Sequence, residues 1–555
     1  MNAGKVLMGL APLVASGGAS AQERPNIIVI LADDLGFSDA GCYGGEIRTP
    51  VLDRMAAEGI RLTQLYNTGR SCPSRAALLT GLYPHRTGVG EMIRSGRDAW
   101  PAGYRGFRSD NNLTIAEVLR DEGYYTALAG KWHLGERPTP VERGFEDFYG
   151  FFPGASDYWD PKRFRRLPAT ATPRSYAEGT FYATEAITDY AIDFAGAARD
   201  RHAPLFLFLS YNAPHFPLQA PEERVERYVE RYAQGWDAIR EERIARLRKM
   251  GILPPEAEAA PRGEVVRSPF CDRTHAVPAW DTLSEEQQRD LARRMAVYAA
   301  MVEIMDKQIG RLFEALEANG QLEHSLVIFL SDNGACAEWH EFGFDGRSGA
   351  AYRVHTGEEL AEMGQAGTYH HYGTGWAGVS CTPFRLYKHF AHEGGISAPC
   401  IVWRGRGVER PGRIDHTPCH LTDILPTCLA AAGCPFPEHY ADRRLVRPEG
   451  ISLLPLLDKR SIARRRPIFA EHEGNRMVRI GKWKLVASYY DGQRWELYDI
   501  SRDRAELHDR AAEHPRRVAR MQRRYFEWAE RNGVEPWPQL MNRYGDEALP
   551  VYNER

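Results

Sequence analysis

The 555-residue chain is predicted to be an α/β protein with a large, mostly parallel central sheet, followed by a smaller α+β domain. Apolar runs of strand length alternate with helix-length segments through most of the chain, as expected for a sheet covered by helices on both faces. After residue 437 the pattern changes to short strands and one Arg-rich helix near 514–532. We therefore expect a first domain at 22–437 and a second domain at 438–555 with a short antiparallel sheet.

Four apolar runs predict buried central strands, because none shows the polar alternation of a half-exposed strand. They cover residues 26–32, 125–129, 205–209 and 326–330. Pro50 at a first helical position and the Gly59 stop predict a helix between them, and further helices are predicted at 76–79, 113–121, 184–199 and 288–318. In such sheets, ligands bind beyond the carboxyl ends of the strands.

Residues 221–283 depart from this alternation. Arg and Glu are dense around Tyr228, Tyr232 and Trp236, and a Pro-containing stretch follows. We interpret the segment as an inserted helix and loop that lie over the edge of the sheet. A solvated helical face explains the composition equally well.

The N-terminus has the pattern of a secretory signal peptide. Lys5 precedes an apolar core at 6–15, and Ala19-Ser20-Ala21 forms a cleavage pattern before Gln22. We therefore expect residues 1–21 to be removed and the mature protein to be periplasmic or secreted. No other apolar stretch approaches the roughly 20 residues of a membrane span.

Composition excludes two classes of partner and one class of scaffold. Lys+Arg 71 against Asp+Glu 74 gives a net charge of −3, so there is no long-range field for nucleic acid or an anionic membrane. An anionic substrate must therefore meet locally placed cations. The nine cysteines lack zinc spacing and are too few for a disulfide scaffold, although Cys419 and Cys434 could pair after export.

Chemically capable side chains follow the ends of all four predicted strands. They are Asp33 and Asp34, Lys131 and His133, His215, and Asp332 and Asn333. The carboxylate and amide groups offer only hard oxygen ligands, which suit Ca²⁺ or Mg²⁺ and not zinc. Turn and capping chemistry is the alternative interpretation of Asp-Asp-Leu-Gly and Asp-Asn-Gly.

The segment from Ser71 to Gly81 starts a helix. Pro73 fixes a turn, Ser71 is predicted at or just before the helix N-terminus, and Arg75 lies one turn further on, placed to reach back. Free N–H groups and the helix dipole favour an anion at such a position. Taken alone, this pattern also fits an ordinary helix cap.

Together these segments resemble the formylglycine-dependent sulfatases of the alkaline phosphatase superfamily. The segment 71–81 is similar to the family signature C-x-P-S-R-x-x-x-L-T-G with Ser71 at the modified position, since Cys72 is one residue out of register with Pro73. The other matching motifs lie at 25–34, at 130–135 (G-K-W-H-L-G), at 213–215, at 331–334 (S-D-N-G), at Lys388 with 393–395, and at 495–499 (W-E-L-Y-D).

The resemblance implies an alkaline-phosphatase-like α/β/α sandwich and a sulfatase that hydrolyses sulfate monoesters. It implies that a radical-SAM maturase oxidises Ser71 to formylglycine in an anaerobic or facultative bacterium. One Ca²⁺, with Mg²⁺ less favoured, would be held by Asp33, Asp34, Ser71, Asp332 and Asn333. The catalytic residues carried over are Ser71, Arg75, Lys131, His133, His215 and Lys388.

The physical chemistry of these residue types agrees with that interpretation. Sulfate ester cleavage spreads charge over peripheral oxygens, so placed cations such as Lys131 and Lys388 stabilise it. Arg75 offers a rigid fork of donors, and a histidine near pH 7 can work as acid or base. Solvated lysines and hydrogen-bonded core histidines are the ordinary alternatives.

Export, near-neutral charge and the polar insertion favour a sulfated carbohydrate as substrate. Two other functions stay open on the sequence. One is a phosphatase or phosphodiesterase that uses unmodified Ser71, and the other is a non-catalytic glycan-binding relative.

Overall fold

The structure is a computed structural model that describes residues 24–548, except 95–96, 109, 267–273, 339, 348–349, 459, 463, 465 and 490–491. The signal peptide predicted at 1–21 lies outside the described residues, as does Cys271. Within the described part of the chain, every helix is too short or too polar to cross a lipid bilayer.

A mixed, mostly parallel sheet of ten strands forms the centre of the molecule, with the order β11-β2-β10-β9-β1-β6-β3-β4-β5 and β12 beside β2. The strands are β1 (Asn26–Ala32), β2 (Ile60–Tyr66), β3 (Tyr125–Lys131), β4 (Asp147–Phe151), β5 (Arg165–Leu167), β6 (Leu205–Ser210), β9 (Ser325–Ser331), β10 (Ser397–Arg404), β11 (Arg413–Asp415) and β12 (Cys419–His420). All four predicted strands are confirmed. Strand β10 runs antiparallel to β2 and β9, and β5 runs antiparallel to β4.

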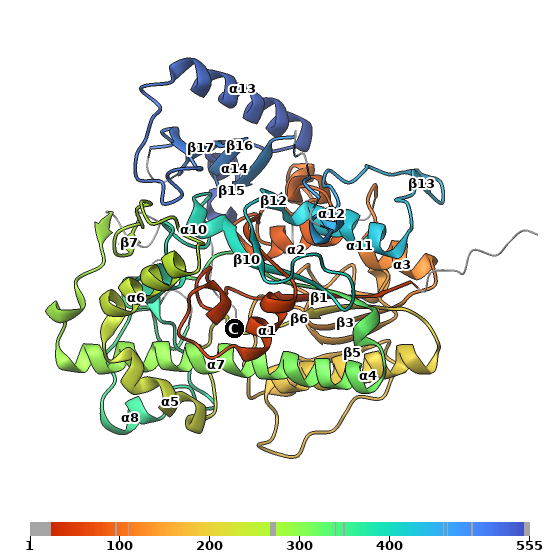
Figure 1. The fold of residues 1–555 in the computed structure, drawn as a ribbon, viewed down its shortest axis with the longest axis horizontal. Helices are drawn as coiled ribbons and strands as arrows, with labels where there is room; N and C mark the ends of the chain where they lie inside the picture. The colour runs from red at the N-terminus through yellow and green to blue at the C-terminus, as the bar shows by residue number, and fades with distance from the viewer. Residues whose placement is uncertain are drawn as a thin grey trace, which may run out of the picture.

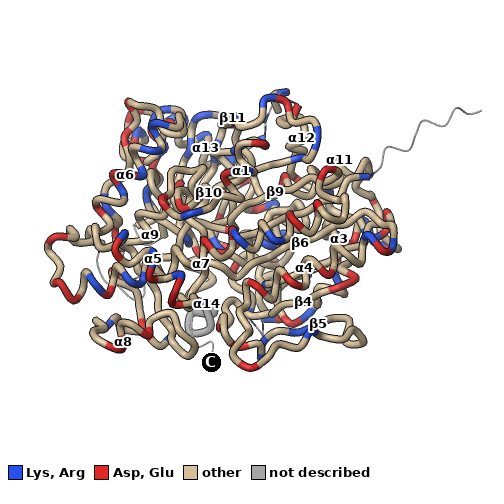
Figure 2. The backbone as a smooth tube through the Cα atoms, turned by 60° about the horizontal axis from the view of Figure 1, so that its bottom comes forward, with Lys and Arg blue, Asp and Glu red and all other residues tan. Residues whose placement is uncertain are grey.

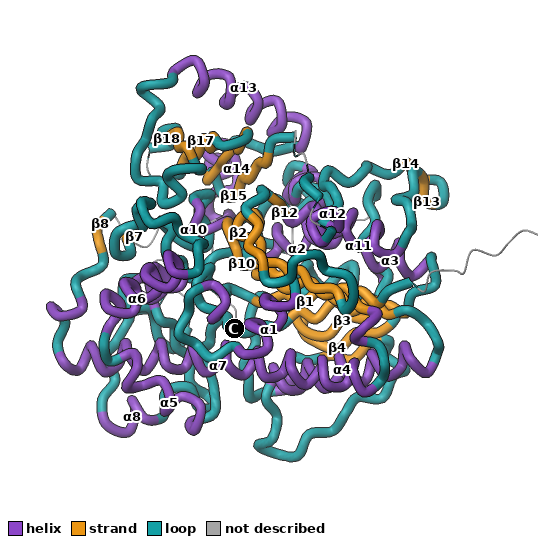
Figure 3. The backbone as a smooth tube through the Cα atoms, in the orientation of Figure 1, coloured by secondary structure: helices purple, strands orange, loops and turns teal. Residues whose placement is uncertain are grey.

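Helices cover both faces of this sheet, as the predicted sandwich requires (Figure 1). One face carries α1 (Pro50–Glu58), α4 (Ala183–Asp200) and α7 (Glu285–Ala318), and the other carries α2 (Ser71–Thr80), α3 (Ile115–Asp121), α11 (Ile424–Ala432) and α12 (Leu454–Leu457). Alternate side chains of β1 pack to opposite faces: Ile28 and Ile30 join one apolar cluster, and Ile27 and Val29 join the other. Figure 3 shows the sheet between these two layers of helices.

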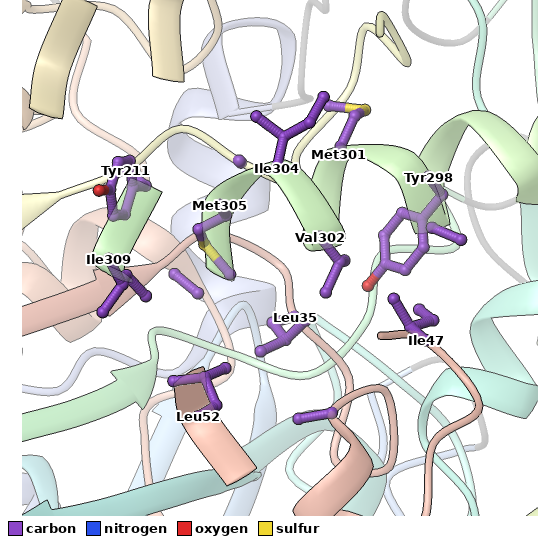
Figure 4. Close-up of a cluster of buried hydrophobic side chains, with 14 of the residues drawn as sticks. Leu35, Ile47, Leu52, Tyr211, Tyr298, Met301, Val302, Ile304, Met305 and Ile309 are labelled. Carbon is purple, nitrogen blue, oxygen red and sulfur yellow. The ribbon is translucent and has the colours of Figure 1, made fainter. Parts of the chain in front are cut away.

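The long helix α7 supports the loop that follows β1. Ser284 caps its N-terminus by accepting a hydrogen bond from the backbone of Gln287. Figure 4 shows side chains of α7 facing Leu35, which lies just beyond the end of β1. The hydroxyl of Tyr298 donates to Asp39 Oδ2 at 2.6 Å. The segment after β1 is therefore held by apolar packing and by a buried hydrogen bond.

The segment 221–283 contains α5 (Glu222–Tyr232), which packs on α7, and α6 (Gly235–Lys249), which packs on α9 (Gly373–Ser380). Tyr228 donates a hydrogen bond to Glu303 of α7 at 2.6 Å, and Arg293 of α7 pairs with Glu222 and Glu226. No described residue of 221–283 lines the pocket reported below. The segment nevertheless reaches the edge of the sheet, because buried Arg243 of α6 forms an ion pair at 2.7 Å with Asp39, which follows β1.

A four-stranded antiparallel sheet follows late in the chain, as predicted. It consists of β15 (Ile468–His472), β16 (Asn475–Ile480), β17 (Trp483–Ala487) and β18 (Glu496–Asp499), with α13 (Pro515–Asn532) and α14 (Trp537–Ala548) after it. In Figure 1 this blue region lies at the top of the molecule. Glu393, at the start of α10 (Glu393–Ile396), connects it to the first sheet through Lys484 at 3.0 Å and Arg504 at 2.8 Å.

The remaining described strands and α-helices are short. They are β7 (Glu264–Val265), β8 (His275–Ala276), β13 (His439–Tyr440), β14 (Arg443–Arg444), α8 (Gly357–Ala361) and α9 (Gly373–Ser380). All eight described cysteines are free and buried, so the bridge considered between Cys419 and Cys434 does not form. Figure 2 shows Lys and Arg interspersed with Asp and Glu along the backbone, in line with the small net charge.

Candidate functional site

The parallel pairing of β1 and β9 builds the acidic part of the site. Ala32 pairs in register with Ser331, so the residues that follow each strand emerge side by side. The backbone N–H of Asp34 donates to Asp332 Oδ1 at 3.2 Å, and Asn333 Nδ2 donates to Asp34 Oδ1 at 2.5 Å. Asp33 is also buried here. Four oxygen-bearing side chains thus converge without exposure to solvent.

Ser71 reaches this group from the first turn of α2, directly after β2. Its hydroxyl donates to Asp332 Oδ2 at 2.6 Å and accepts from Arg75 Nε at 2.9 Å. The imidazole Nδ1 of His133 lies 3.3 Å from the same oxygen. The Ser71 hydroxyl is therefore surrounded by an acid, a cation and an imidazole.

Cys72, the neighbour of Ser71, faces elsewhere. Its sulfur packs in the apolar cluster on the α2 face of the sheet, with Met92 Sδ at 3.6 Å. Burial raises the pKa of its thiol to about 11, so it stays protonated at neutral pH.

Arg75 is fully buried and binds four different groups. Besides Ser71, it donates to the backbone carbonyl of Lys131 at 3.1 Å, to the hydroxyl of Ser210, and to Asp332 Oδ2 at 3.2 Å. A planar guanidinium can satisfy acceptors in several fixed directions at once. Arg75 therefore connects the ends of β3, β6 and β9 to the first turn of α2.

Two buried lysines pair with the two acids that follow β1. Lys131, the last residue of β3, forms an ion pair with Asp33, and Lys388 Nζ lies 2.9 Å from Asp34 Oδ2. Burial raises the pKa of Asp33 to about 8, and the charge of Asp332 adds to the effect although Lys131 opposes it. Burial also acts to raise the pKa of Asp34, but Lys388 and His215 hold it well below its usual range.

The loop of Lys388 is fixed by close contact with the loop after β9. The backbone N–H of Lys388 donates to the carbonyl of Ala335 at 3.0 Å, and Gly334 donates to Gly395 at 2.9 Å. A Cβ on Gly334 would lie 1.8 Å from the carbonyl oxygen of Gly394, so only glycine allows this approach. The S-D-N-G and E-G-G motifs therefore pack directly against each other.

The two predicted histidines are neutral at neutral pH. Burial lowers the pKa of both His133 and His215 well below the ordinary value, and nearby lysines add to the effect. His215 Nδ1 lies 2.6 Å from the carbonyl oxygen of Phe216, which can only accept, so Nδ1 carries the proton. Its Nε2 is left as an acceptor, 3.4 Å from Asp34 Oδ2.

The oxygen groups of this site fit a hard divalent cation. Asp33 Oδ1 and Asn333 Oδ1 are buried and make no hydrogen bond. Buried polar atoms without a partner are rare and destabilising, and a bound cation would satisfy both. Because the converging ligands are carboxylate and amide oxygens, they match Ca²⁺ or Mg²⁺.

A pocket opens onto these groups. Its lining combines polar and apolar side chains with two small residues: Arg70, Ser71, Met92, His133, Gly154, Ala155, His215, Phe216, Glu338, Tyr369 and Lys388. Arg70 and Glu338 were missed by the sequence reasoning. Glu338 Oε1 lies 3.5 Å from Arg70 Nη1 and 3.6 Å from Lys388 Nζ. The only sequence signal for Arg70 was its position next to Ser71, and the only one for Glu338 was its position shortly after Asn333.

The comparisons with known proteins bear on this arrangement. The model of the sulfatase family matches residues 25–434, which is most of the chain. The chain belongs to the sulfatase family. Its fold and family place this sulfatase in the alkaline phosphatase superfamily, among hydrolases that cleave sulfate esters.

Two curated relatives match the sulfatase over most of its length. An uncharacterized sulfatase of Schizosaccharomyces pombe is 33% identical over 89% of this chain and 91% of the relative. An arylsulfatase of Klebsiella aerogenes is 34% identical over 81% of this chain and 96% of the relative.

Solved structures show the same fold. Ps i-CgsB in complex with k-i-k-neocarrahexaose superimposes with a TM-score of 0.65 at 24% identity, covering 96% of this chain and 99% of that one. BT4656 in complex with D-glucosamine-2-N,6-O-disulfate gives a TM-score of 0.58 at 21% identity, covering 96% of this chain and all (100%) of that one.

Proposed function

We propose that this sulfatase hydrolyses the sulfate ester of a sulfated carbohydrate, with a formylglycine made from Ser71 and one bound Ca²⁺. The observation that carries the proposal is the surrounding of the Ser71 hydroxyl. Asp332, Arg75 and His133 all lie within 3.3 Å of that oxygen. Cys72 points into an apolar cluster instead, which supports residue 71 as the modified position.

Oxidised to formylglycine and hydrated, residue 71 would supply a geminal diol whose second hydroxyl allows sulfate to be released after the first attacks sulfur. Arg75 and Asp332 orient the oxygen of residue 71 from two sides. Orientation of this kind removes much of the entropic cost of the attack.

The lysines and histidines serve the charged ester and its leaving group. Lys131 and Lys388 bring two cations to the edge where sulfate oxygens would lie, and both are buried, where their charge acts strongly. His215 is neutral without substrate because of burial and the nearby lysines. An anionic ester beside it raises its pKa, so it can hold the proton that the leaving alcohol takes. We assign to His133 the role of accepting the proton of the residue 71 hydroxyl, because its Nδ1 lies 3.3 Å from the oxygen of Ser71.

The cation would be held by Asp33, Asp34, Asp332 and Asn333 together with an oxygen of residue 71. It would supply positive charge to the attacking oxygen and to the sulfate, as a Lewis acid does. The buried, unbonded Asp33 Oδ1 and Asn333 Oδ1 support this assignment. Calcium is favoured over magnesium because it accepts several protein oxygens in irregular geometry.

Two structural neighbours support a carbohydrate substrate, because one is in complex with a neocarrahexaose and the other with a sulfated glucosamine. The apolar part of the pocket, formed by Met92, Phe216 and Tyr369, offers surfaces against which a sugar ring can pack. We further propose that the protein is exported by a bacterium, and that a radical-SAM enzyme of that bacterium converts Ser71 to formylglycine.

The proposal is tested with two neighbouring substitutions. Ser71→Ala should abolish release of sulfate from a panel of sulfated saccharides and from an aryl sulfate, whereas Cys72→Ala should keep most of the activity. Thermal unfolding of both variants checks that the fold is retained. Full activity of Ser71→Ala, or cleavage of matched phosphate esters in preference to sulfate esters, would contradict the proposal.

A further inference from the structure

A second cluster of ligand-type side chains lies outside the pocket. His389 follows Lys388 directly, whereas His472 and Glu473 lie at the end of β15 and in the turn to β16. One ligand atom from each of the three lies within 4.8 Å of the other two. All three side chains are buried. The cluster therefore joins the Lys388 loop to the late antiparallel sheet.

Two N···O separations in this cluster, each to a different oxygen of Glu473, equal the spacing of neighbouring ligands around a tetrahedral metal. Glu473 Oε2 lies 3.3 Å from His389 Nε2, and Glu473 Oε1 lies 3.4 Å from His472 Nε2. Ligands held at 2.0–2.1 Å by a tetrahedral Zn²⁺ are about 3.3–3.4 Å apart. The two ring centroids are 5.1 Å apart. Two imidazoles bound to one tetrahedral zinc have centroids roughly 5 Å apart by the same geometry.

The hydrogen bonding of His472 supports a ligand at this point. Only 2% of this residue is exposed, yet its Nδ1 makes no hydrogen bond. Buried polar side chains nearly always have a partner. Its Nε2 faces the Glu473 carboxylate at 3.4 Å, which is a separation that a shared cation would bridge.

We propose that His389, His472 and Glu473 form a zinc site, with a water molecule at the fourth position. Two imidazoles and one carboxylate are a ligand set that zinc proteins use, and its nitrogen ligands distinguish it from the oxygen-lined site of Asp33 and Asp34. Bound zinc would tie the hairpin of β15 and β16 to the residue after Lys388. The zinc site takes no part in the sulfatase chemistry. Its role is to hold the β15–β16 hairpin in position against His389.

Opposing charge near the cluster is the main factor against binding. The guanidinium of Arg70 is close enough to act electrostatically on both His389 and Glu473. Arg70 also pairs with Glu338 at 3.5 Å, which offsets part of its charge. The site is therefore expected to bind zinc reversibly and to release it to a strong chelator.

The test uses the full-length protein saturated with Ca²⁺ and then titrated with Zn²⁺. Metal analysis after gel filtration should find one zinc per chain in the wild type and less than a tenth of that in Glu473→Gln and His472→Ala. Glu473→Gln keeps the side-chain volume, so it decides the matter if His472→Ala fails to fold. His508→Ala is the matched control, because His508 is exposed and pairs with Glu258, and neither belongs to the cluster.

Three further measurements separate this site from the oxygen-lined one. Zinc should raise the thermal unfolding temperature of the wild type and of His508→Ala but not that of Glu473→Gln. X-ray absorption should show two histidine nitrogens at about 2.0–2.1 Å from zinc. Asp33→Asn should lose sulfatase activity yet still bind one zinc.

Absence of zinc from the wild type, or equal zinc in the wild type and Glu473→Gln, would overturn the inference without touching the sulfatase assignment. Conversely, an active Asp33→Asn that binds one zinc would contradict the proposed catalytic site alone.

Discussion

Replacing Arg75 by lysine removes the connecting group of the site while keeping its positive charge. The guanidinium of Arg75 binds Ser71, Asp332, Ser210 and the carbonyl of Lys131 from a fully buried position. A lysine ammonium is a single point with three donors and cannot reach these four acceptors together. We therefore expect at least two of the four hydrogen bonds to be lost.

The magnitude follows from the charge of the donor. Hydrogen bonds to charged groups contribute about 1.5–3 kcal/mol each, so the loss of two lowers the free energy of unfolding by about 3–6 kcal/mol. One of the lost bonds orients the oxygen of residue 71. Removing about 3 kcal/mol of orientation from the transition state corresponds to a fall in kcat/KM of roughly a hundredfold.

The assay measures kcat/KM on an aryl sulfate and urea unfolding for the wild type and Arg75→Lys. Arg54→Lys serves as the control, because Arg54 is half exposed and pairs with Glu58 at only 3.8 Å. The mass of the peptide with residue 71 must be checked in each variant, since Arg75 lies within the motif that resembles the modified segment. If Arg75→Lys carries the modification and keeps wild-type kcat/KM, the reasoning about the buried guanidinium is refuted.

Three other expectations follow from the structure. Because burial raises the pKa of Asp33 to about 8, a proton competes with the cation below that pH. Calorimetry should therefore find that Ca²⁺ affinity falls by up to about tenfold for each pH unit from about pH 8 down to about pH 6. A Ca²⁺ affinity that does not depend on pH would contradict this expectation. Ile309 is a buried residue of α7, so Ile309→Ala should lower the free energy of unfolding, measured in urea, by about 2–5 kcal/mol. Lys307→Ala, at an exposed position of the same helix, should change it little. Glu393→Gln should lower the free energy of unfolding by about 1.5–3 kcal/mol, because it removes a charged partner of partly buried Arg504 and one of the two carboxylates that pair with buried Lys484. Glu317→Gln on an exposed turn of α7 is its control. Equal stability of Glu393→Gln and its control would show that the buried pairing is not needed.

The central strands were predictable where burial on both faces imposes a continuous apolar run. Strands β1, β3, β6 and β9 are of this kind. Strand β2 was not predicted, because Arg61, Thr63 and Gln64 interrupt its apolar residues. Strand β10 starts with Ser-Ala-Pro, which reads as a loop, although its partner strands on both sides accommodate it.

The site was predictable to the extent that its residues follow strand ends. Asp33 and Asp332 are of this kind, and the parallel register of β1 and β9 brings them together. Lys388 could be found only from its motif, because it precedes a strand that runs in the opposite direction and starts at the same edge. Glu338 lines the pocket because of the path of the loop that follows β9. Local sequence does not determine the path of such a loop.

The most direct test of the account is the mass of the peptide that contains residue 71, measured on active protein from its native host. The expected peptide is two hydrogens lighter than the unmodified serine form, with the change located at residue 71 by fragmentation. Fully active protein whose residue 71 is unaltered serine would contradict the account.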